Sequence, residues 1–321
     1  MSGPTGVILA HLGTPEAPTV SAVRRYLAEF LSDPRVVEMP RLLWWPVLYG
    51  IILTTRPKRS AAAYQRVWGE EGSPLMVMAC RQQRLLQQAL DPKQWQVAIA
   101  MRYGTPAIAT VIDHLWQQGC RRLVVLPMYP QYSATTTASV HDALIDALAG
   151  RRNLPGYHFI RDYHDHPSYI SALAASVRQH WQRHGRGEHL LVSFHGIPQR
   201  YVDAGDPYQQ ECQRTTEMLV QALSLNQGEW SQSYQSRLGR EPWLMPYTNH
   251  TLETLAHHGV KTVDVICPGF STDCLETLDE IMVENAVLFT KSGGTALRYI
   301  PALNDAPSHI SLLKSLVTSA S

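Results

Sequence analysis

Short apolar runs alternate with longer amphipathic segments along the whole chain. Runs of strand length occupy residues 6–12, 95–101, 122–127, 157–160, 189–194 and 263–267. The stretch from residue 168 to residue 181 instead places Ile170, Leu173 and Val177 on one stripe of a helix. Continuous apolar runs are typical of strands buried on both faces, and their alternation with helices predicts parallel sheets covered on both sides.

The chain is long enough for two such units. It has 321 residues, and about 150 residues is a common size for one domain. The turn-rich segment RRNLPG, residues 151–156, lies near the midpoint. The sequence therefore predicts two α/β lobes in tandem, residues 1–153 and 154–304.

Composition narrows the class of partner. Charged residues make up 17% of the chain, below the usual value of about 25%, and the formal net charge is +1. This charge offers no electrostatic footprint for nucleic acid. The first residues lack the basic start and apolar core of a signal peptide, so we expect a cytoplasmic protein. No G-x-G-x-x-G or P-loop pattern follows a strand, which removes the usual support for nucleotide binding.

The five cysteines are scattered and include no C-x-x-C pair. Such spacing is typical of reduced thiols in an intracellular protein. It disfavours a structural zinc site and an iron–sulfur cluster held by closely spaced cysteines.

A histidine stands where one apolar strand ends. In LLVSFHGIP, residues 190–198, His195 follows the strand and precedes the chain-breaking Gly196 and Pro198. Ligands of open parallel sheets bind beyond the carboxyl ends of the strands. His195 is therefore a candidate site residue, and the alternative is a histidine that is hydrogen-bonded in an ordinary loop.

Three glutamates recur at helical spacing near the C-terminal end. Glu276, Glu280 and Glu284 are four residues apart, so a helix would align them as one carboxylate ridge. No Lys or Arg lies among them to relieve their repulsion, which would suit a divalent cation if the ridge faced a cleft. The alternative is a solvated helix face on which Asp273 and Glu276 form a capping box.

The segment from residue 42 to residue 53 is nearly all apolar. It is too short to cross a bilayer, which needs about 20 residues, and Pro46 and Gly50 disfavour a regular helix. Basic residues flank it on both sides. One interpretation is a buried core segment. The other is an exposed lip, formed by Leu42, Leu43, Trp44 and Trp45, that touches a membrane or encloses a flat apolar ligand.

A set of short segments in a fixed order resembles the ferrochelatase family, closest to its short Gram-negative bacterial form. The segments are LGTP (12–15), YQRVWGEEGSPL (64–75), RYGTP (102–106), LPMYPQYS (126–133), SFHGIPQRY (193–201), SRLGREPWLMPYT (236–248), CPGFSTDCLETLDEI (267–281) and YIPALN (299–304). Each is weak alone, but together they span nearly the whole chain.

The resemblance implies a chelatase-like α/β fold, with two tandem Rossmann-like lobes and a C-terminal helix, residues 305–321, that packs back on the first lobe. It implies that His195 and Glu276 are the catalytic pair and metal ligands, with Glu280 and Glu284 as a path for iron or protons. Residues matching the porphyrin pocket of the family are Tyr64, Ser73, Arg102, Tyr129 and Trp243. Leu42, Leu43, Trp44 and Trp45 match its active-site lip.

The implied reaction inserts Fe2+ into protoporphyrin IX to give haem b and two protons, the terminal step of haem biosynthesis. Iron is then a substrate, and no cofactor is permanently bound. Relatives with a 2Fe-2S cluster have a cysteine after YPQYS, where this chain has Ala134, and cysteines near the C-terminus, where none follows Cys274. A cluster is therefore not expected.

Several alternatives remain open. They are coproporphyrin as substrate, another tetrapyrrole metal chelatase, and a porphyrin carrier without catalysis. The implied partners are protoporphyrin IX and ferrous iron, with peripheral contact at the inner membrane and no nucleic acid. Cys274 also stands where some relatives have a histidine beside the catalytic glutamate, so the resemblance supports no metal relay through that position.

Overall fold

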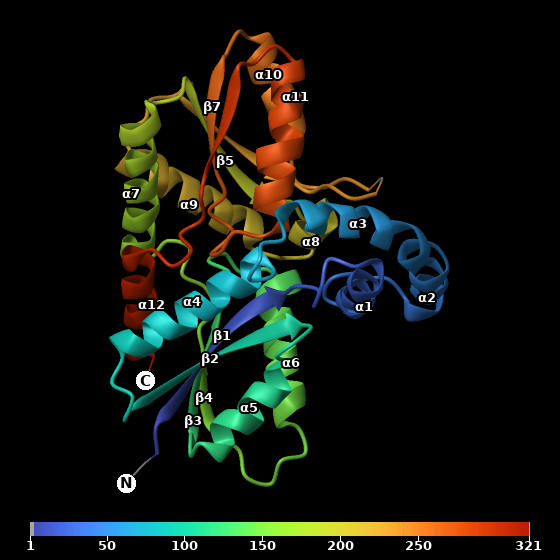
Figure 1. The fold of residues 1–321 in the computed structure, drawn as a ribbon, viewed down its shortest axis with the longest axis vertical. Coiled ribbons are helices and arrows are strands. Elements are labelled where there is room, and N and C mark those ends of the chain that lie inside the picture. The colour runs from blue at the N-terminus through green and yellow to red at the C-terminus, as the bar shows by residue number, and fades with distance from the viewer. Residues whose placement is uncertain (1–2, 240, 321) are drawn as a thin grey trace. The chain divides into compact units, whose positions relative to one another are not determined.

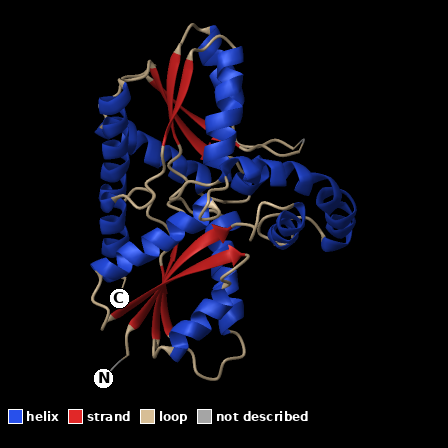
Figure 2. Cartoon of the chain, viewed as in Figure 1, coloured by secondary structure: helices blue, strands red, loops and turns tan. Residues whose placement is uncertain are grey.

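The structure is a computed structural model that describes residues 3–239 and 241–320. It divides into two compact units. The first unit runs to Tyr129 and also contains Ser133–Asp162 and the segment from Asp305 onward. The second contains Pro130–Tyr132 and Tyr163–Asn304. Each unit is built on one parallel sheet with helices on its faces (Figure 1 and Figure 2).

The first sheet has the strand order β2-β1-β3-β4. Its strands are β1 (Thr5–Gly13), β2 (Trp95–Tyr103), β3 (Arg122–Pro127) and β4 (Gly156–Phe159). Helices α5 (Ile108–Gln117) and α6 (Ser139–Leu148) pack on it through buried apolar residues such as Ile8, Ile112 and Leu144. Helix α4 (Pro74–Ala89) contacts β1 and β2, and α12 (Pro307–Ser319) packs against α4.

The boundary between the units differs from the predicted one. Strand β4 pairs in parallel with β3, with Val125 opposite Phe159, so it belongs to the first sheet. The turn-rich segment 151–156 is therefore the connection from α6 into β4. The first unit continues to Asp162 because its fourth strand follows that turn.

Helix α1 (Val20–Leu31) is followed by a long helical run from residue 41 to residue 67. This run comprises α2 (Arg41–Val47), the π-helical turn η1 (Leu48–Ile52) and α3 (Leu53–Val67). The expectation that Pro46 and Gly50 disfavour a regular helix is correct in part. A helix forms through both residues, but its hydrogen-bond pattern shifts to the wider π form at Leu48, two residues after Pro46.

The second sheet repeats the first with the order β6-β5-β7-β8. Its strands are β5 (His189–His195), β6 (Trp230–Gln235), β7 (Thr262–Ile266) and β8 (Ala296–Ile300). Its helices are α7 (Pro167–His184), α8 (Gln199–Asp203), α9 (Tyr208–Ala222), α10 (Thr248–His257), the π-helix η3 (Glu276–Asn285) and α11 (Ala286–Lys291). Leu191, Val265, Ile281 and Phe289 lie in its core.

Strand order decides where a site can form. In both sheets the first strand of the unit lies between the second and the third. The chain therefore passes first to one side of this strand and then back to its other side. Such a switch point opens a crevice at the carboxyl ends of the two central strands. In the second unit these strands are β5, which ends at His195, and β7, which precedes the turn at Phe270.

The structure confirms the predicted pair of parallel sheets flanked by helices, but two strands have no counterpart in the prediction. Strands β6 and β8 are the edges of the second sheet, and their first three residues are only partly buried. An edge strand needs fewer apolar residues, which explains why WSQSYQ carries no strand signal. Among the described residues, no helix is long and apolar enough to cross a membrane.

Candidate active site

His195 is the last residue of β5, rather than the first residue beyond it, and its side chain is half-buried. Its Nδ1 lies 2.7 Å from the carbonyl oxygen of Gly196, which can only accept a hydrogen bond. Nδ1 therefore carries the proton in the neutral ring, and the lone pair of Nε2 remains available for a proton or a metal ion.

Two aromatic rings flank this imidazole. The centroid of the His195 ring lies 6.4 Å from the Trp243 ring and 6.5 Å from the Phe270 ring. Trp243 is held by a bridge to Pro198, and the neighbouring Leu244 donates its N–H to the Ile197 carbonyl. Gly196 permits this approach, because a Cβ there would lie 3.0 Å from the Gln235 carbonyl oxygen and 3.2 Å from the Trp243 ring.

The acidic ridge lies on a π-helix, not on the α-helix that its spacing suggested. Helix η3 begins at Glu276, and the side chains of Glu276 and Glu280 are half-buried, whereas Glu284 is exposed. π-Helical segments are rare and occur often at functional sites. Glu276 and Glu280 therefore differ from Glu284 in solvent exposure, although the three residues are evenly spaced in the sequence.

The Glu280 carboxylate is clamped by one residue. Ser236 donates its backbone N–H to Oε1 at 2.7 Å and its hydroxyl to Oε2 at 2.5 Å. Burial raises the pKa of Glu280, and the Glu276 carboxylate acts in the same direction, while Ser236 and His195 act against it. Geometry joins the three groups as well. Gln235 pairs with His195 in the sheet and donates its side-chain N–H to the Glu276 carbonyl, and the next residue, Ser236, holds Glu280, so the three groups form one cluster within the second unit.

The capping-box alternative for Glu276 is wrong. The backbone N–H of Asp273, which such a box would satisfy, donates instead to Asn304 Oδ1 at 2.8 Å. The Asp273 carboxylate accepts hydrogen bonds from Tyr299 and from Asn304, both at 2.7 Å. Glu276 is therefore not engaged as a cap. Its side chain meets Cys274, where burial and the Glu276 carboxylate raise the pKa of the thiol and keep it protonated.

Four of the residues that match the family's porphyrin pocket lie in the first unit. Tyr64 is buried on α3, and Tyr129 packs against the core beside β3. The hydroxyl of Ser73, at the start of α4, lies 2.7 Å from the hydroxyl of Thr14. The fifth residue, Trp243, lies in the second unit beside His195.

Arg102 is held by a buried acid that the sequence analysis did not identify. Its Nη2 donates to Asp33 Oδ2 at 2.5 Å, and its Nε donates to the carbonyl of Ser139 at 2.9 Å. Tyr103 and Ser139 donate to the same Asp33 oxygen at 2.7 and 2.6 Å. Burial raises the pKa of Asp33, but these hydrogen bonds outweigh burial and hold it below its ordinary value. The result is an arginine fixed in one orientation.

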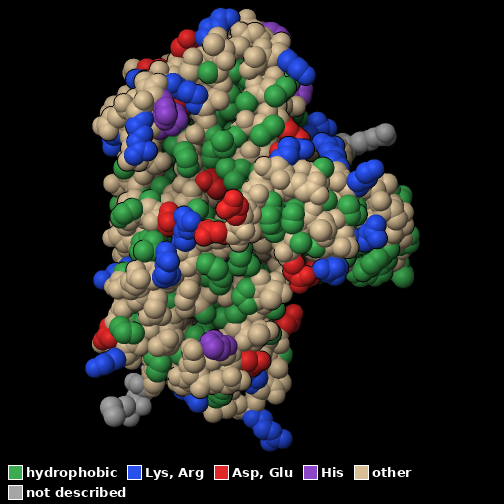
Figure 3. All heavy atoms as spheres, in the orientation of Figure 1, with side chains coloured by type: hydrophobic (Ala, Val, Ile, Leu, Met, Phe, Trp, Pro, Cys, Tyr) green, Lys and Arg blue, Asp and Glu red, His purple; other side chains and the backbone are tan. Residues whose placement is uncertain are grey.

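The apolar segment is exposed at three of its four predicted lip residues. Leu42, Leu43 and Trp45 are 88%, 65% and 37% exposed, and Tyr49 and Ile51 extend the same surface. Figure 3 shows hydrophobic side chains gathered over this helical run, with basic side chains beside them. Trp44 was predicted to belong to the lip, but it is buried, and its Nε1 donates to the Leu31 carbonyl at 2.7 Å.

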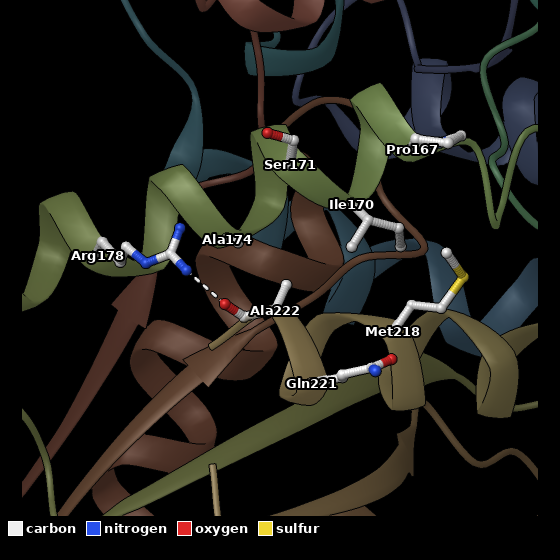
Figure 4. Close-up of a pocket in the computed structure, with 8 residues that line it drawn as sticks. All are labelled: Pro167, Ile170, Ser171, Ala174, Arg178, Met218, Gln221 and Ala222. Atoms are coloured by element: carbon white, nitrogen blue, oxygen red, sulfur yellow. Dashed lines mark hydrogen bonds between the residues drawn. The ribbon is translucent and has the colours of Figure 1, made fainter. Parts of the chain in front are cut away.

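A separate groove lies between α7 and α9 (Figure 4). Its described lining includes Ile170, Ala174 and Met218, and the guanidinium of Arg178 donates to the carbonyl of Ala222. No predicted site residue is among these lining residues. Most of its described lining is apolar, and the hydrogen bond of Arg178 joins the two helices.

The model of the ferrochelatase family matches residues 4–321. The ferrochelatase of Vibrio cholerae serotype O1 is 54% identical over 312 residues, which cover 97% of each chain. The ferrochelatase of Enterobacter sp. strain 638 is 54% identical, with 98% of each chain covered. That of Nitrosococcus oceani is 52% identical over 97% of this chain and 85% of its own.

Solved structures give the same fold at low identity. SirB from Bacillus subtilis, solved with Fe3+, has a TM-score of 0.59 at 10% identity and covers 99% of this chain and 95% of that one. CbiX, described as the terminal enzyme of sirohaem biosynthesis in denitrifying bacteria, has a TM-score of 0.54 at 13% identity, with 99% of each chain covered. These likenesses concern the fold, and they confirm the predicted architecture.

Proposed function

This chain belongs to the ferrochelatase family, and on this premise we propose that it inserts Fe2+ into protoporphyrin IX to give haem b and two protons. The observation that carries the proposal is the cluster of one imidazole and two carboxylates in the second unit. His195 keeps Nε2 available, and the consecutive residues Gln235 and Ser236 tie its strand to Glu276 and Glu280.

The reaction needs groups that accept protons and groups that receive a hydrated cation. A free-base porphyrin carries two pyrrole protons, and both must leave as iron enters. We assign the acceptance of a pyrrole proton to Nε2 of His195, since a neutral imidazole suits that step near pH 7. Glu276 is its catalytic partner and metal ligand, because carboxylates bind hydrated divalent ions and can carry protons away. Glu280 and Glu284 extend the path away from this pair.

The porphyrin itself needs apolar contacts and a cation. We assign porphyrin contacts to Tyr64, Ser73, Arg102 and Tyr129 of the first unit and to Trp243 of the second. The guanidinium of Arg102 is held in one orientation by Asp33 and Ser139, and its remaining N–H donors suit a propionate carboxylate. Aromatic and apolar walls can also hold the macrocycle in a bent form that presents its nitrogen lone pairs.

The exposed lip supports a peripheral membrane contact. Leu42 and Leu43 project from a helix whose flanks carry Arg41, Arg56 and Lys58, the pattern of a helix that lies on an anionic membrane surface. We therefore propose a cytoplasmic protein that touches the inner membrane, with no nucleic-acid partner. Iron is a substrate, and no permanently bound cofactor or 2Fe-2S cluster is expected, because Ala134 replaces the cysteine that follows YPQYS in cluster-bearing relatives.

An anaerobic assay tests the proposal. Purified protein is incubated with protoporphyrin IX and Fe2+, and haem b is measured by its pyridine haemochrome spectrum. Coproporphyrin with Fe2+ and protoporphyrin with Co2+ are run in parallel. We expect haem b to form, with a higher kcat/KM for protoporphyrin IX and Fe2+ than for either parallel reaction. Preference for coproporphyrin or for cobalt would assign a different chelatase activity. Porphyrin binding without insertion of any metal would make the protein a carrier.

A further inference from the structure

Two consecutive residues at the end of β6 form hydrogen bonds both to the segment that carries His195 and to the acidic helix η3. The last residue of β6, Gln235, lies opposite His195 in the sheet, and its carbonyl accepts the N–H of Gly196 at 2.8 Å. Its side-chain Nε2 donates to the backbone carbonyl of Glu276 at 3.1 Å. The next residue, Ser236, holds the Glu280 carboxylate through two donors. Two consecutive residues therefore contact His195's strand and both half-buried glutamates.

Ser236 adopts a backbone conformation that serine rarely takes. Its φ is +66°, in the left-handed region that favours glycine and asparagine. Non-glycine residues persist there when their surroundings fix them, and such residues cluster at functional sites. Here the conformation turns the backbone N–H and the hydroxyl toward the same carboxylate, with one donor to each oxygen.

We propose that Ser236 is a positioning residue that fixes the Glu280 carboxylate beside His195 so that it can receive the incoming iron. The inference rests on the proposed function and adds to it a residue that has no role in the assigned machinery. Each carboxylate oxygen accepts one bond from Ser236 and keeps a second lone pair for the water shell of a divalent ion. Charge-assisted bonds of this kind, one to each oxygen, hold the carboxylate in one orientation.

Replacement by glycine separates this role from a structural one. Ser236→Gly removes the hydroxyl and leaves the left-handed backbone without strain, so the fold is expected to survive. The KM for Fe2+ should rise by about tenfold, the scale of one charge-assisted hydrogen bond, while the KM for protoporphyrin stays unchanged. Cobalt(II) titrated into the porphyrin-free protein, followed by its visible absorbance, should bind more weakly by a similar factor.

Two further variants complete the test. Asparagine also tolerates the left-handed conformation and supplies a side-chain donor, so Ser236→Asn should restore most of the iron KM. Ser224 is an exposed serine with φ +54° at the end of α9, and Ser224→Gly is the matched control that should change neither constant.

The possible failures are distinguishable. A wild-type protein that inserts no metal would refute the proposed function itself. An active wild type whose Ser236→Gly variant keeps its iron KM and its cobalt affinity would overturn the positioning role alone. Parallel losses in the KM for iron, the KM for porphyrin and the melting temperature would show a structural role instead, and would also overturn it.

Discussion

Two histidines of β5 show how position decides the use of a side chain. His189 starts the strand, is buried, and lies 2.9 Å from the hydroxyl of Ser231, and burial lowers its pKa. His195 ends the strand, where its Nδ1 is bound to a backbone carbonyl and its Nε2 is not committed to that contact. The same residue type is a core group at one end of the strand and a candidate catalytic group at the other.

Replacing His195 by alanine should reduce iron insertion by about 100-fold or more, the usual scale for the loss of a positioned general base. Porphyrin binding should persist, since aromatic and apolar contacts supply most of its affinity. The anaerobic haem assay measures the first effect, and the fluorescence of bound protoporphyrin measures the second. Near-normal turnover of His195→Ala with Fe2+ would contradict the catalytic assignment.

Glu276→Gln is the companion variant, because it keeps the size of the side chain and removes its charge. The capping role is excluded by the bond from Asp273 N–H to Asn304, so glutamine should suppress turnover with little change in melting temperature. An unchanged rate would show that the charge of Glu276 has no part in the reaction.

At the scale of an element, the helical run 41–67 separates its apolar residues by face. Trp44 and Leu48, one turn apart, point into the first unit and are 8% and 0% exposed. Leu42, Leu43 and Trp45 lie on the remaining faces and meet solvent. A segment that is uniformly apolar in sequence therefore serves as core on one side and as surface on the other.

Paired substitutions in this helix should have opposite effects. Leu42→Ser with Leu43→Ser should weaken binding to liposomes of anionic lipid and leave the melting temperature nearly unchanged, because both side chains are exposed. Trp44→Ala should instead lower the free energy of unfolding by about 3–5 kcal/mol, the usual cost of truncating a buried aromatic residue. Liposome flotation and urea unfolding measure the two effects. Equal liposome binding by the double serine variant would contradict the membrane contact.

At the scale of the molecule, the two units share one strand order but not one chemistry. The cluster of His195, Glu276 and Glu280 lies in the second unit. The first unit has its own pair of buried histidines, His11 on β1 and His309 on α12. Burial, with a smaller effect of His309, lowers the pKa of His11 to about 3. This histidine stays neutral and belongs to the core.

The pKa of His11 predicts how the protein responds to acid. The unfolded chain binds a proton at His11 below about pH 6.5, whereas the folded chain does so only near pH 3, so stability is lost as pH falls between these values. The slope from one such group is about 1.4 kcal/mol per pH unit. In urea unfolding between pH 6 and pH 4, His11→Gln should show a shallower loss than the wild type by about this amount.

Replacement of an exposed histidine provides the control for that slope. His258 lies just after α10 on the surface, and His258→Gln should leave the pH dependence of stability unchanged. Identical slopes for wild type and His11→Gln would show that His11 is not the group that titrates on unfolding.

The local pattern of the sequence determined the architecture and the position of the principal candidate. Central strands are buried on both faces, so their apolar runs stand out, and the end of β5 marks His195 directly. The spacing of the glutamates indicated a ridge, because residues four apart lie on neighbouring turns of an α-helix and of a π-helix alike. Each of these features depends on neighbours within one element.

The tertiary structure alone decided which polar groups meet. Asp33 and Arg102 are 69 residues apart in the chain, and Ser236 and Glu280 are 44 apart. The periodicity of apolar residues within one element cannot predict such pairs. The edge strand β6, which precedes Ser236, is mostly polar and has no apolar run that would predict it. Burial of Trp44, exposure of Leu42 and the π form of η3 likewise depend on what packs against each helix. A residue's own neighbours set its element, but contacts from distant segments set the side chain's environment, and the chemistry of this site depends on that environment.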